Sequence, residues 1–180
     1  MEFCEVIRRR KSIRKYKPDP IPDDVLNRIL DAGRMAPSAK NYQPWHFIVV
    51  REPEMKKKVA EACRNQFFMA EAGAIICGCA FEKVAWSHMG NYMPSWTHDL
   101  TIALDHMILA ATNEGLGTCW IGAFHEKMVK EVLGIPEGVR VVALTPVGYP
   151  AEEARERGRL ELKDIVSYEK FETKRDTEKH

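Results

Sequence analysis

The feature that most constrains the fold is a segment that is apolar on nearly every side of the helix it predicts. Residues 97–114 carry Leu, Ile, Met and Ala around almost the whole circumference, and Gly115 ends the segment. A helix of this kind must be covered on every side. A chain of 180 residues forms one domain. We therefore expect a second subunit to supply part of the cover.

Shorter helices and strands alternate along the rest of the chain, without a glycine-rich turn after the first strand. This pattern disfavours a dinucleotide-binding fold and a P-loop. Apolar spacing, proline positions and terminal glycines predict helices at 2–10, 22–36, 53–63 and 125–133, and strands at 46–50, 74–80, 118–124 and 139–147.

The composition changes after Pro150. A charged stretch comes first, and strand-like apolarity then returns at Leu162, Ile165, Val166 and Tyr168. We expect a single domain at 1–171, in which 150–171 form an arm, followed by a charged, disordered tail at 172–180.

Several protein classes are excluded on sequence grounds. The longest apolar run, 72–81, is about half the length that a bilayer-spanning helix needs. The first seven residues lead directly into a basic run without a secretory core. Five cysteines are an odd number in a chain able to build its own core, which favours a reduced protein over a disulfide scaffold. We expect a cytoplasmic protein without a membrane partner.

The net charge of +1 conceals a strong local imbalance. Seven of the 27 Lys and Arg residues lie between Arg8 and Lys17, with no acid among them. The rest of the chain therefore contains 20 basic residues and all 26 acidic residues. A concentrated cationic patch on an otherwise acidic chain indicates an anion bound at one place. A protein that binds polyanions would spread its positive charge over a face.

The first candidate site lies within this patch, in residues 10–14, here called the cationic turn. It offers three cations and one hydroxyl. Arginine side chains match phosphate oxygens bidentately, and serine adds a donor at close range. A solvated basic turn is an equally good interpretation of these residues alone. Taken alone, the arm residues Arg157 and Arg159 are interpreted as solvated surface residues.

Two further segments carry ligand-binding features. Residues 37–45, the polar loop, place Ser38, Asn41 and Gln43 between two prolines, and rigid polar loops suit ligand recognition. Residues 115–122, the glycine turn, contain three glycines that permit close approach to the backbone. Each segment alone is equally compatible with ordinary turn or packing roles.

Together, in this order and spacing, these segments resemble the nitroreductase family of FMN-dependent oxidoreductases, over residues 5–166. The motifs are Arg-x-Ser-x-Arg at 10–14, Pro-Ser-x-x-Asn-x-Gln-Pro-Trp at 37–45 and Gly-Leu-Gly-x-x-Trp-Ile-Gly at 115–122, followed by Gly-Tyr-Pro at 148–150. The resemblance implies an α+β fold, with a mixed β-sheet flanked by helices. It further implies an intertwined homodimer whose C-terminal arms are exchanged and whose two FMN sites lie at the subunit interface.

The same resemblance implies electron transfer from NADH or NADPH through flavin N5 to an electron-poor small molecule, such as a nitro compound or a quinone. The order of reaction implied is ping-pong. Because the cofactor carries this chemistry, no side chain is expected to act as a catalytic acid or base.

The resemblance also implies roles for particular residues. The cationic turn and the arm arginines would hold the phosphate and ribityl chain, with Arg14 toward the pyrimidine edge, where a cation favours the reduced anionic flavin. The polar loop would reach the flavin from the partner subunit. Backbone groups of the glycine turn would face N5 and O4. The cofactor-binding residues implied are Arg10, Lys11, Ser12, Arg14, Pro37, Ser38, Ala39, Asn41, Asn65, Ile121, Gly122, Arg157 and Arg159.

Other conspicuous residues are assigned to packing. Cys77 and Cys79 share one face of a predicted strand but lack the second pair that a structural zinc site needs, so no metal site is expected. Cys119 is likewise interpreted as a packing residue. Residues 86–96, here called the aromatic segment, either pack at the dimer interface or form a lid that selects the acceptor.

Three alternatives remain open at this point. The flavin could serve one dedicated metabolite, with nitro compounds as adventitious acceptors. A flavin-binding protein without turnover would be yellow but would not be bleached by nicotinamide donors. A small nucleic-acid-binding protein using residues 8–17 would be colourless, with steeply salt-dependent binding.

Overall fold

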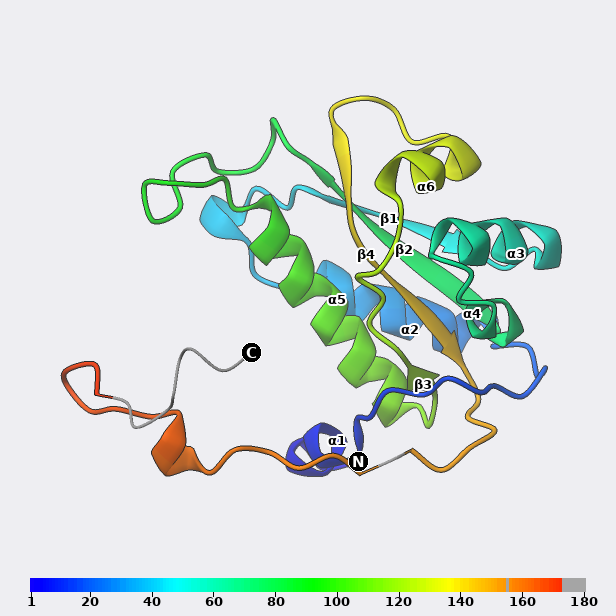
Figure 1. Ribbon diagram of the computed structural model, residues 1–180, viewed down its shortest axis with the longest axis horizontal. Helices are drawn as coiled ribbons and strands as arrows, with labels where there is room; N and C mark the ends of the chain where they lie inside the picture. Colours follow the sequence, from blue (N-terminus) through cyan, green and yellow to red (C-terminus); the bar gives the residue numbers. More distant parts are fainter. Residues whose placement is uncertain (155, 173–180) are drawn as a thin grey trace.

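A four-stranded β-sheet lies at the centre of the computed structural model, which describes residues 1–154 and 156–172 (Figure 1). The strand order is β1-β2-β4-β3. The two central strands are the longest and almost wholly buried. The strands are β1 (Trp45–Val50), β2 (Ala74–Phe81), β3 (Gly117–Thr118) and β4 (Val139–Gly148).

The four named strands pair antiparallel. Val50, the last residue of β1, pairs with Ile75 near the start of β2, because the intervening helices return the chain to the same end of the sheet. The mixed sheet expected from the sequence is therefore not found in the described residues. Parallel pairing there is limited to one bridge, between Ser12 and Thr118.

Helices cover both faces of the sheet, and each face has its own core cluster. One face packs against α2 (Asp23–Arg34) and α5 (Trp96–Asn113), and the other against α3 (Pro53–Ala62), α4 (Phe68–Glu71) and α6 (Glu126–Leu133). This arrangement establishes the expected α+β class. The remaining helix, α1 (Phe3–Arg9), lies near the C-terminal end of α5 (Figure 1).

The apolar helix α5 lies close against the sheet at Gly78. A Cβ atom at this position would come within 2.8 Å of Leu104 and 2.9 Å of Leu100, so only glycine permits the approach. The β2–β4 register also shifts at this point. One chain does not cover the whole helix, since Ile102 remains 39% exposed.

The helix predictions are confirmed to within two residues at each end. Gly134 ends α6 in the left-handed region, with φ of 66°. The predicted strand at 118–124 is wrong, because β3 ends at Thr118 and only Ile121 pairs again, with Leu144. The register places Cys119 opposite Pro146, which has no N–H group to donate, and the ladder is interrupted there.

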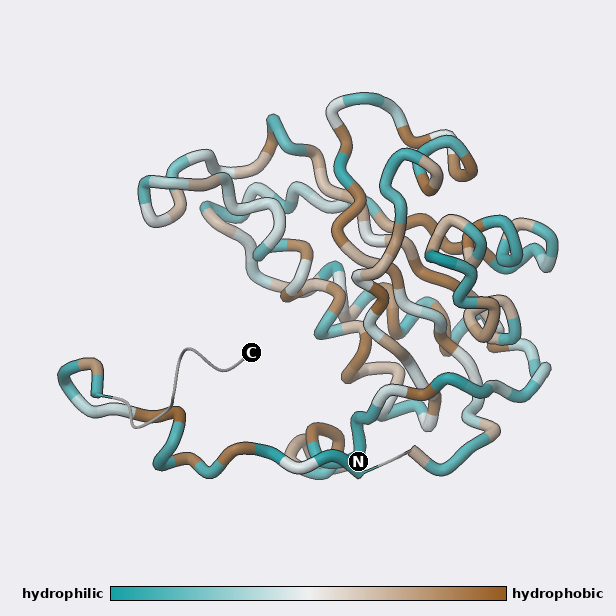
Figure 2. The backbone as a smooth tube through the Cα atoms, in the orientation of Figure 1, coloured by the Kyte–Doolittle hydropathy of each residue, from teal (hydrophilic) through white to brown (hydrophobic). Residues whose placement is uncertain are grey.

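The arm leaves the sheet after β4 and extends past α1 (Figure 1). In this single chain the described part of the arm contains one 3₁₀ turn, η2 (Leu162–Asp164). Its apolar side chains are exposed in this chain, at 74% for Leu162 and 57% for Ile165. Figure 2 shows hydrophobic stretches in the arm, away from the sheet.

Most of the predicted tail, 173–180, lies outside the described residues. Among the helices that are described, none combines the length and apolarity that crossing a bilayer requires.

Candidate cofactor site

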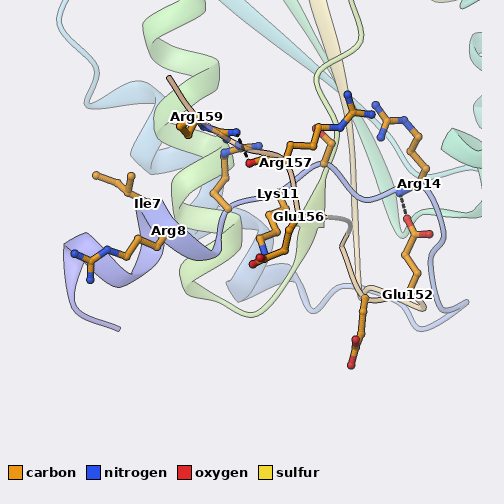
Figure 3. A pocket seen from close by; sticks show the side chains of 11 residues that line it. Ile7, Arg8, Lys11, Arg14, Glu152, Glu156, Arg157 and Arg159 are labelled. Carbon is orange, nitrogen blue, oxygen red and sulfur yellow. Dashed lines mark hydrogen bonds and ion pairs between the residues drawn. The ribbon is translucent and has the colours of Figure 1, made fainter. Parts of the chain in front are cut away.

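A cavity of about 680 Å³ opens where the arm passes over the cationic turn (Figure 3). Six cations and three acids line it, so its field is positive in spite of the acids. Two arginines of the arm, Arg157 and Arg159, line it together with Lys11 (Figure 3). The lining residues are Ile7, Arg8, Arg10, Lys11, Ser12, Arg14, Glu152, Glu153, Glu156, Arg157 and Arg159.

The cationic turn is held in place by β3. The amide of Ile13 donates to the Thr118 carbonyl at 2.8 Å, and the hydroxyl of Tyr16 donates to the Ile13 carbonyl at 2.8 Å. Gly117 permits this contact, because a Cβ atom there would lie 2.6 Å from Ile13. The turn therefore presents its cations from a fixed backbone.

The arm is joined to the cationic turn by two acids. Glu152 accepts a hydrogen bond from the Arg14 amide at 2.6 Å, and Glu156 pairs with the Lys11 ammonium at 2.8 Å. The hydrogen bond from Lys11 lowers the pKa of the exposed Glu156 carboxyl. These contacts bring two segments that are far apart in sequence to one pocket lined by cations.

Cys119 lies directly behind this turn. Its side chain is 3% exposed, and burial raises the pKa of its thiol. The protonated, buried thiol fits the predicted packing role. Cys77 and Cys79 are also buried, with sulfur atoms 3.8 Å apart in the core, which agrees with packing.

The glycine turn leads from β3 to a second group of predicted site residues, Asn65, Ile121 and Gly122. Past Thr118 the chain reaches Ile121 and Gly122, and the residues after α3 run beside it. The side chain of Gln66 donates to the Ala123 carbonyl at 3.0 Å. Asn65, the residue before it, has φ of 59°. The segments that carry Asn65 and Gly122 are thus joined at Gln66 and Ala123.

Two residues of this region were missed by sequence reasoning. Trp120 is 41% exposed, and its indole nitrogen lies 3.8 Å from the Cβ position that Gly122 leaves empty. A tryptophan two residues before a glycine was the available signal. Gln66 carries no such signal, because its role as a bridge to Ala123 depends on tertiary contacts alone.

The polar loop contains an unusual backbone. Lys40, Asn41 and Gln43 have φ of 52°, 57° and 48°, in the left-handed region that non-glycine residues rarely occupy. The hydroxyl of Ser38 accepts a hydrogen bond from the Gln43 amide at 2.9 Å. Strained conformations of this kind cluster at ligand sites. The loop also carries a contact to Asp99, a further residue that the sequence did not identify.

The two groups of predicted residues do not converge within one chain. The polar loop lies at the N-terminal end of α5, where Ala39 contacts Asp99, whereas the cationic turn pairs with β3 just beyond the C-terminal end (Figure 1). A helix of 18 residues spans about 27 Å. Pro37, Ser38, Ala39 and Asn41 are therefore separated from the cationic pocket.

The residues present fit a flavin mononucleotide. The cationic pocket offers guanidinium groups and a serine hydroxyl, which suit a phosphate. The adjoining region offers backbone groups at Gly122 and the side chain of Asn65, which suit the polar edge of a ring. The amide and carbonyl of Ile121 are already bonded to Leu144, at 2.9 and 3.1 Å. A concave pocket that gathers its cations also differs from the spread face expected of a nucleic-acid-binding protein.

Comparison with known proteins gives consistent results. The model of the Nitroreductase family matches residues 7–75 and 64–149. A protein of Archaeoglobus fulgidus named for NADH dehydrogenase or NAD(P)H nitroreductase activity is 40% identical, covering 85% of this chain and 88% of the relative.

Two further matches extend over most of the chain. The FMN reductase [NAD(P)H] of Bacillus subtilis is 28% identical, covering 94% of this chain and 74% of the relative. The crystal structure of a nitroreductase family protein of Clostridium difficile superposes with a TM-score of 0.87 at 28% identity, covering 95% and 100% of the two chains.

Proposed function

Because this chain belongs to the nitroreductase family, we propose that it is an FMN-dependent oxidoreductase that uses NADH or NADPH to reduce an electron-poor small molecule. The observation that carries the proposal is the cationic pocket. Six cations from the two ends of the chain line it, together with the hydroxyl of Ser12. The FMN reductase among the relatives supports the choice of cofactor.

The cationic pocket is the proposed phosphate site. Arg10 and Ser12, with Arg157 and Arg159 from the arm, would bind the phosphate and the ribityl chain. Guanidinium groups bind phosphate oxygens by charge-assisted hydrogen bonds, which are about twice as strong as neutral ones. Lys11, which lines the same pocket, would bind the phosphate once its ion pair with Glu156 is broken. The rigid backbone of the cationic turn keeps these groups ready for the ligand.

The other half of the proposed site would bind the flavin ring. Arg14 would lie toward the pyrimidine edge, where its positive charge stabilises negative charge on the ring system. Backbone groups of Gly122 would face N5 and O4, and Asn65 would contact the pyrimidine. Ile121 would hold Gly122 in place, because its own amide and carbonyl bond to Leu144. When bound, FMN supplies hydride acceptance at N5 and electron delivery to a nitro compound, quinone or similar acceptor.

No side chain needs to act as an acid or base in this scheme. The chain binds and orients the cofactor, and the exposed region beside the glycine turn admits the nicotinamide donor and then the acceptor. Because the two would use the same space in turn, we expect ping-pong kinetics.

We also propose that the active unit is an intertwined homodimer. The polar loop and the cationic pocket lie at opposite ends of α5, so each complete flavin site would need the polar loop of the partner subunit. An apolar groove of about 690 Å³, which includes Phe3, Ile7, Met35 and Leu109, offers a surface between α1, α2 and α5. The exposed apolar residues of the arm would cross to the neighbour and pack against its sheet.

A visible spectrum of the purified protein tests the proposal. We expect a yellow protein that sediments as a dimer, whose flavin absorbance is bleached anaerobically by NADH or NADPH and restored by a quinone. A colourless monomer that does not bind added FMN would show the proposal to be wrong. Yellow protein that neither donor bleaches would indicate flavin binding without turnover.

A second candidate acceptor is one dedicated metabolite. The exposed Tyr92 and Trp120 side chains, 79% and 41% exposed, offer aromatic surface for a specific ligand. Comparison of kcat/KM for natural metabolites and for generic quinones separates the two possibilities, because a dedicated enzyme favours one natural compound by a wide margin.

A further inference from the structure

We propose that Asp99 is a positioning residue of the flavin site, whose single carboxylate fixes both the polar loop and the aromatic segment. Cofactor binding and acceptor selection then depend on the same side chain. This inference rests on the proposed function, in which the polar loop reaches the flavin of the partner subunit.

The carboxylate of Asp99 connects two segments that are distant in sequence. Asp99 lies in the first turn of α5 and is 4% exposed. Its Oδ1 atom accepts a hydrogen bond from the Ala39 amide at 2.9 Å, and its Oδ2 atom accepts one from the Ser95 hydroxyl at 2.7 Å. Ser95 is completely buried. A buried carboxylate is stable only when its oxygens are satisfied in this way.

Asp99 is the external support of a strained loop. Within the loop, Asn41 donates to the Ser38 carbonyl and Gln43 to the Ser38 hydroxyl, each at 2.9 Å. In the part of the chain that the structure describes, the bond from Ala39 to Asp99 is the one hydrogen bond that joins residues 38–43 to another element. The left-handed residues of the loop are unfavourable by themselves. The end of the loop is held separately, because the Pro44 carbonyl accepts a hydrogen bond from the Phe81 amide at 2.7 Å. Residues 38–43 therefore depend on Asp99 for their placement.

The aromatic segment is fixed at the same point. The Ser95 amide donates to the Trp86 carbonyl at 2.8 Å, which closes the segment into a loop. The ammonium of Lys40 lies 5.8 Å from the centre of the Trp86 ring, a cation–π contact from the polar loop. Tyr92, at the tip, is 79% exposed. The segment is thus joined to the polar loop through Asp99 and through Lys40.

This arrangement has a functional consequence. The polar loop is the segment proposed to lie against the flavin, and the aromatic segment is held beside it because both bind one carboxylate. Exposed aromatic side chains beside a flavin suit planar acceptors, which they contact by stacking. Asp99 itself would touch neither the flavin nor the acceptor, and its effect would be exerted through the two segments.

Three variants separate the two connections. Asp99→Ala removes both hydrogen bonds. Asp99→Asn preserves the side-chain shape, and its amide group bonds to both partners without the charge. Ser95→Ala removes the hydroxyl bond to the Asp99 carboxylate alone and leaves the backbone bond from the Asp99 amide to the Ser95 carbonyl, at 2.9 Å, in place. Glu131→Gln, on the exposed face of α6, is the matched control for loss of a carboxylate.

The measurements are the FMN dissociation constant, from fluorescence titration of the apoprotein, and KM and kcat for the quinone menadione with NADH or NADPH. For Asp99→Ala we expect FMN affinity to fall about tenfold and KM for menadione to rise, as loss of a charged hydrogen bond implies. Asp99→Asn should restore FMN affinity to within about threefold of wild type. Ser95→Ala should raise KM for menadione while FMN affinity and kcat stay unchanged.

Thermal midpoints of all variants show what a purely structural role would produce. If Asp99→Ala lowers the midpoint but leaves FMN affinity and KM within about twofold of wild type, the inference is wrong. If Asp99→Ala does not fold, Ser95→Ala decides, and an unchanged KM for menadione overturns the inference. Wild-type protein that binds no FMN would instead refute the proposed function, before any variant is compared.

Discussion

The ammonium nitrogen of Lys11 lies 2.8 Å from a carboxylate oxygen of Glu156, within the cationic pocket. The contact joins the cationic turn to the arm. It also places a negative charge where the proposed phosphate would bind. The carboxylate of Glu156 is therefore a competitor of the ligand for Lys11, and this competition can be measured.

Replacing Glu156 by Gln removes the competing charge. We expect FMN affinity to rise about two- to threefold, a modest effect because the pair is exposed to solvent. Riboflavin, which lacks the phosphate, should bind the variant and the wild type equally well. Fluorescence titration of both ligands is the measurement, with Glu161→Gln, also on the arm but outside the pocket, as the control. An equal gain for riboflavin would contradict the phosphate assignment.

Replacing Arg14 by Gln tests the position of the ring. Loss of a cation near the pyrimidine edge should make the bound flavin harder to reduce. We expect the midpoint potential to fall by about 10–30 mV, or ~0.5–1.4 kcal/mol for a two-electron couple. Redox titration against a reference dye measures it. Lys15→Gln, on the neighbouring basic residue outside the pocket lining, should leave the potential unchanged, and a shift as large as that of Arg14→Gln would refute the assignment.

The arm can be tested by placing charges on its apolar residues. Burying an apolar side chain of this size contributes about 1.5–3 kcal/mol. The double variant Leu162→Glu and Ile165→Glu should therefore raise the dimer dissociation constant more than tenfold and lower the flavin content. Sedimentation equilibrium measures both at once. Lys163→Glu changes the charge of the same segment without loss of apolar surface and should remain dimeric, whereas a dimeric double variant would exclude arm exchange.

The ion pair between Glu126 and Arg140 gives a pH-dependent prediction. Glu126 accepts two hydrogen bonds from Arg140, at 2.9 and 3.0 Å, and one from the Val141 amide at 3.0 Å. Its pKa is lowered, chiefly by Arg140. After allowance for solvent screening, Glu126→Gln should reduce the free energy of unfolding by about 1 kcal/mol at neutral pH.

The sign of the pH dependence follows from the lowered pKa of Glu126. The stabilisation is complete above the unfolded-state pKa of about 4.3 and is lost as the pH falls through the lower folded-state pKa. Urea titrations at neutral pH and at about pH 3 should show the difference between wild type and variant shrinking. A constant difference would mean that packing, and not charge, is lost. Glu131→Gln, on the same helix, is the control.

The helices and the buried strands were predictable because their apolar spacing is a local property of the sequence. The strand predicted at 118–124 was wrong for a reason that lies elsewhere in the chain, since its hydrogen-bonding partner position is Pro146. A local pattern does not reveal which residue will lie opposite. The antiparallel direction of the sheet likewise depends on where α3 and α4 return the chain.

The candidate site shows the same division. Its cationic and polar motifs are contiguous segments and could be identified from the sequence, whereas Asp99 lies 60 positions from the Ala39 amide that it binds. Nothing in its local sequence distinguishes it from a surface aspartate at a helix start. The left-handed backbone of Lys40 and Gln43 was also unpredictable, because these residue types, unlike glycine and asparagine, give no signal for it.

The placement of the polar loop and the cationic pocket at opposite ends of α5 has a consequence for how activity scales with abundance. If neither half-site retains flavin alone, holoenzyme forms by association of two polypeptides, and dilution below the dimerisation constant releases cofactor from both. Specific activity would then decline on dilution instead of staying constant. Cells that made little of this polypeptide would obtain disproportionately less turnover from each copy.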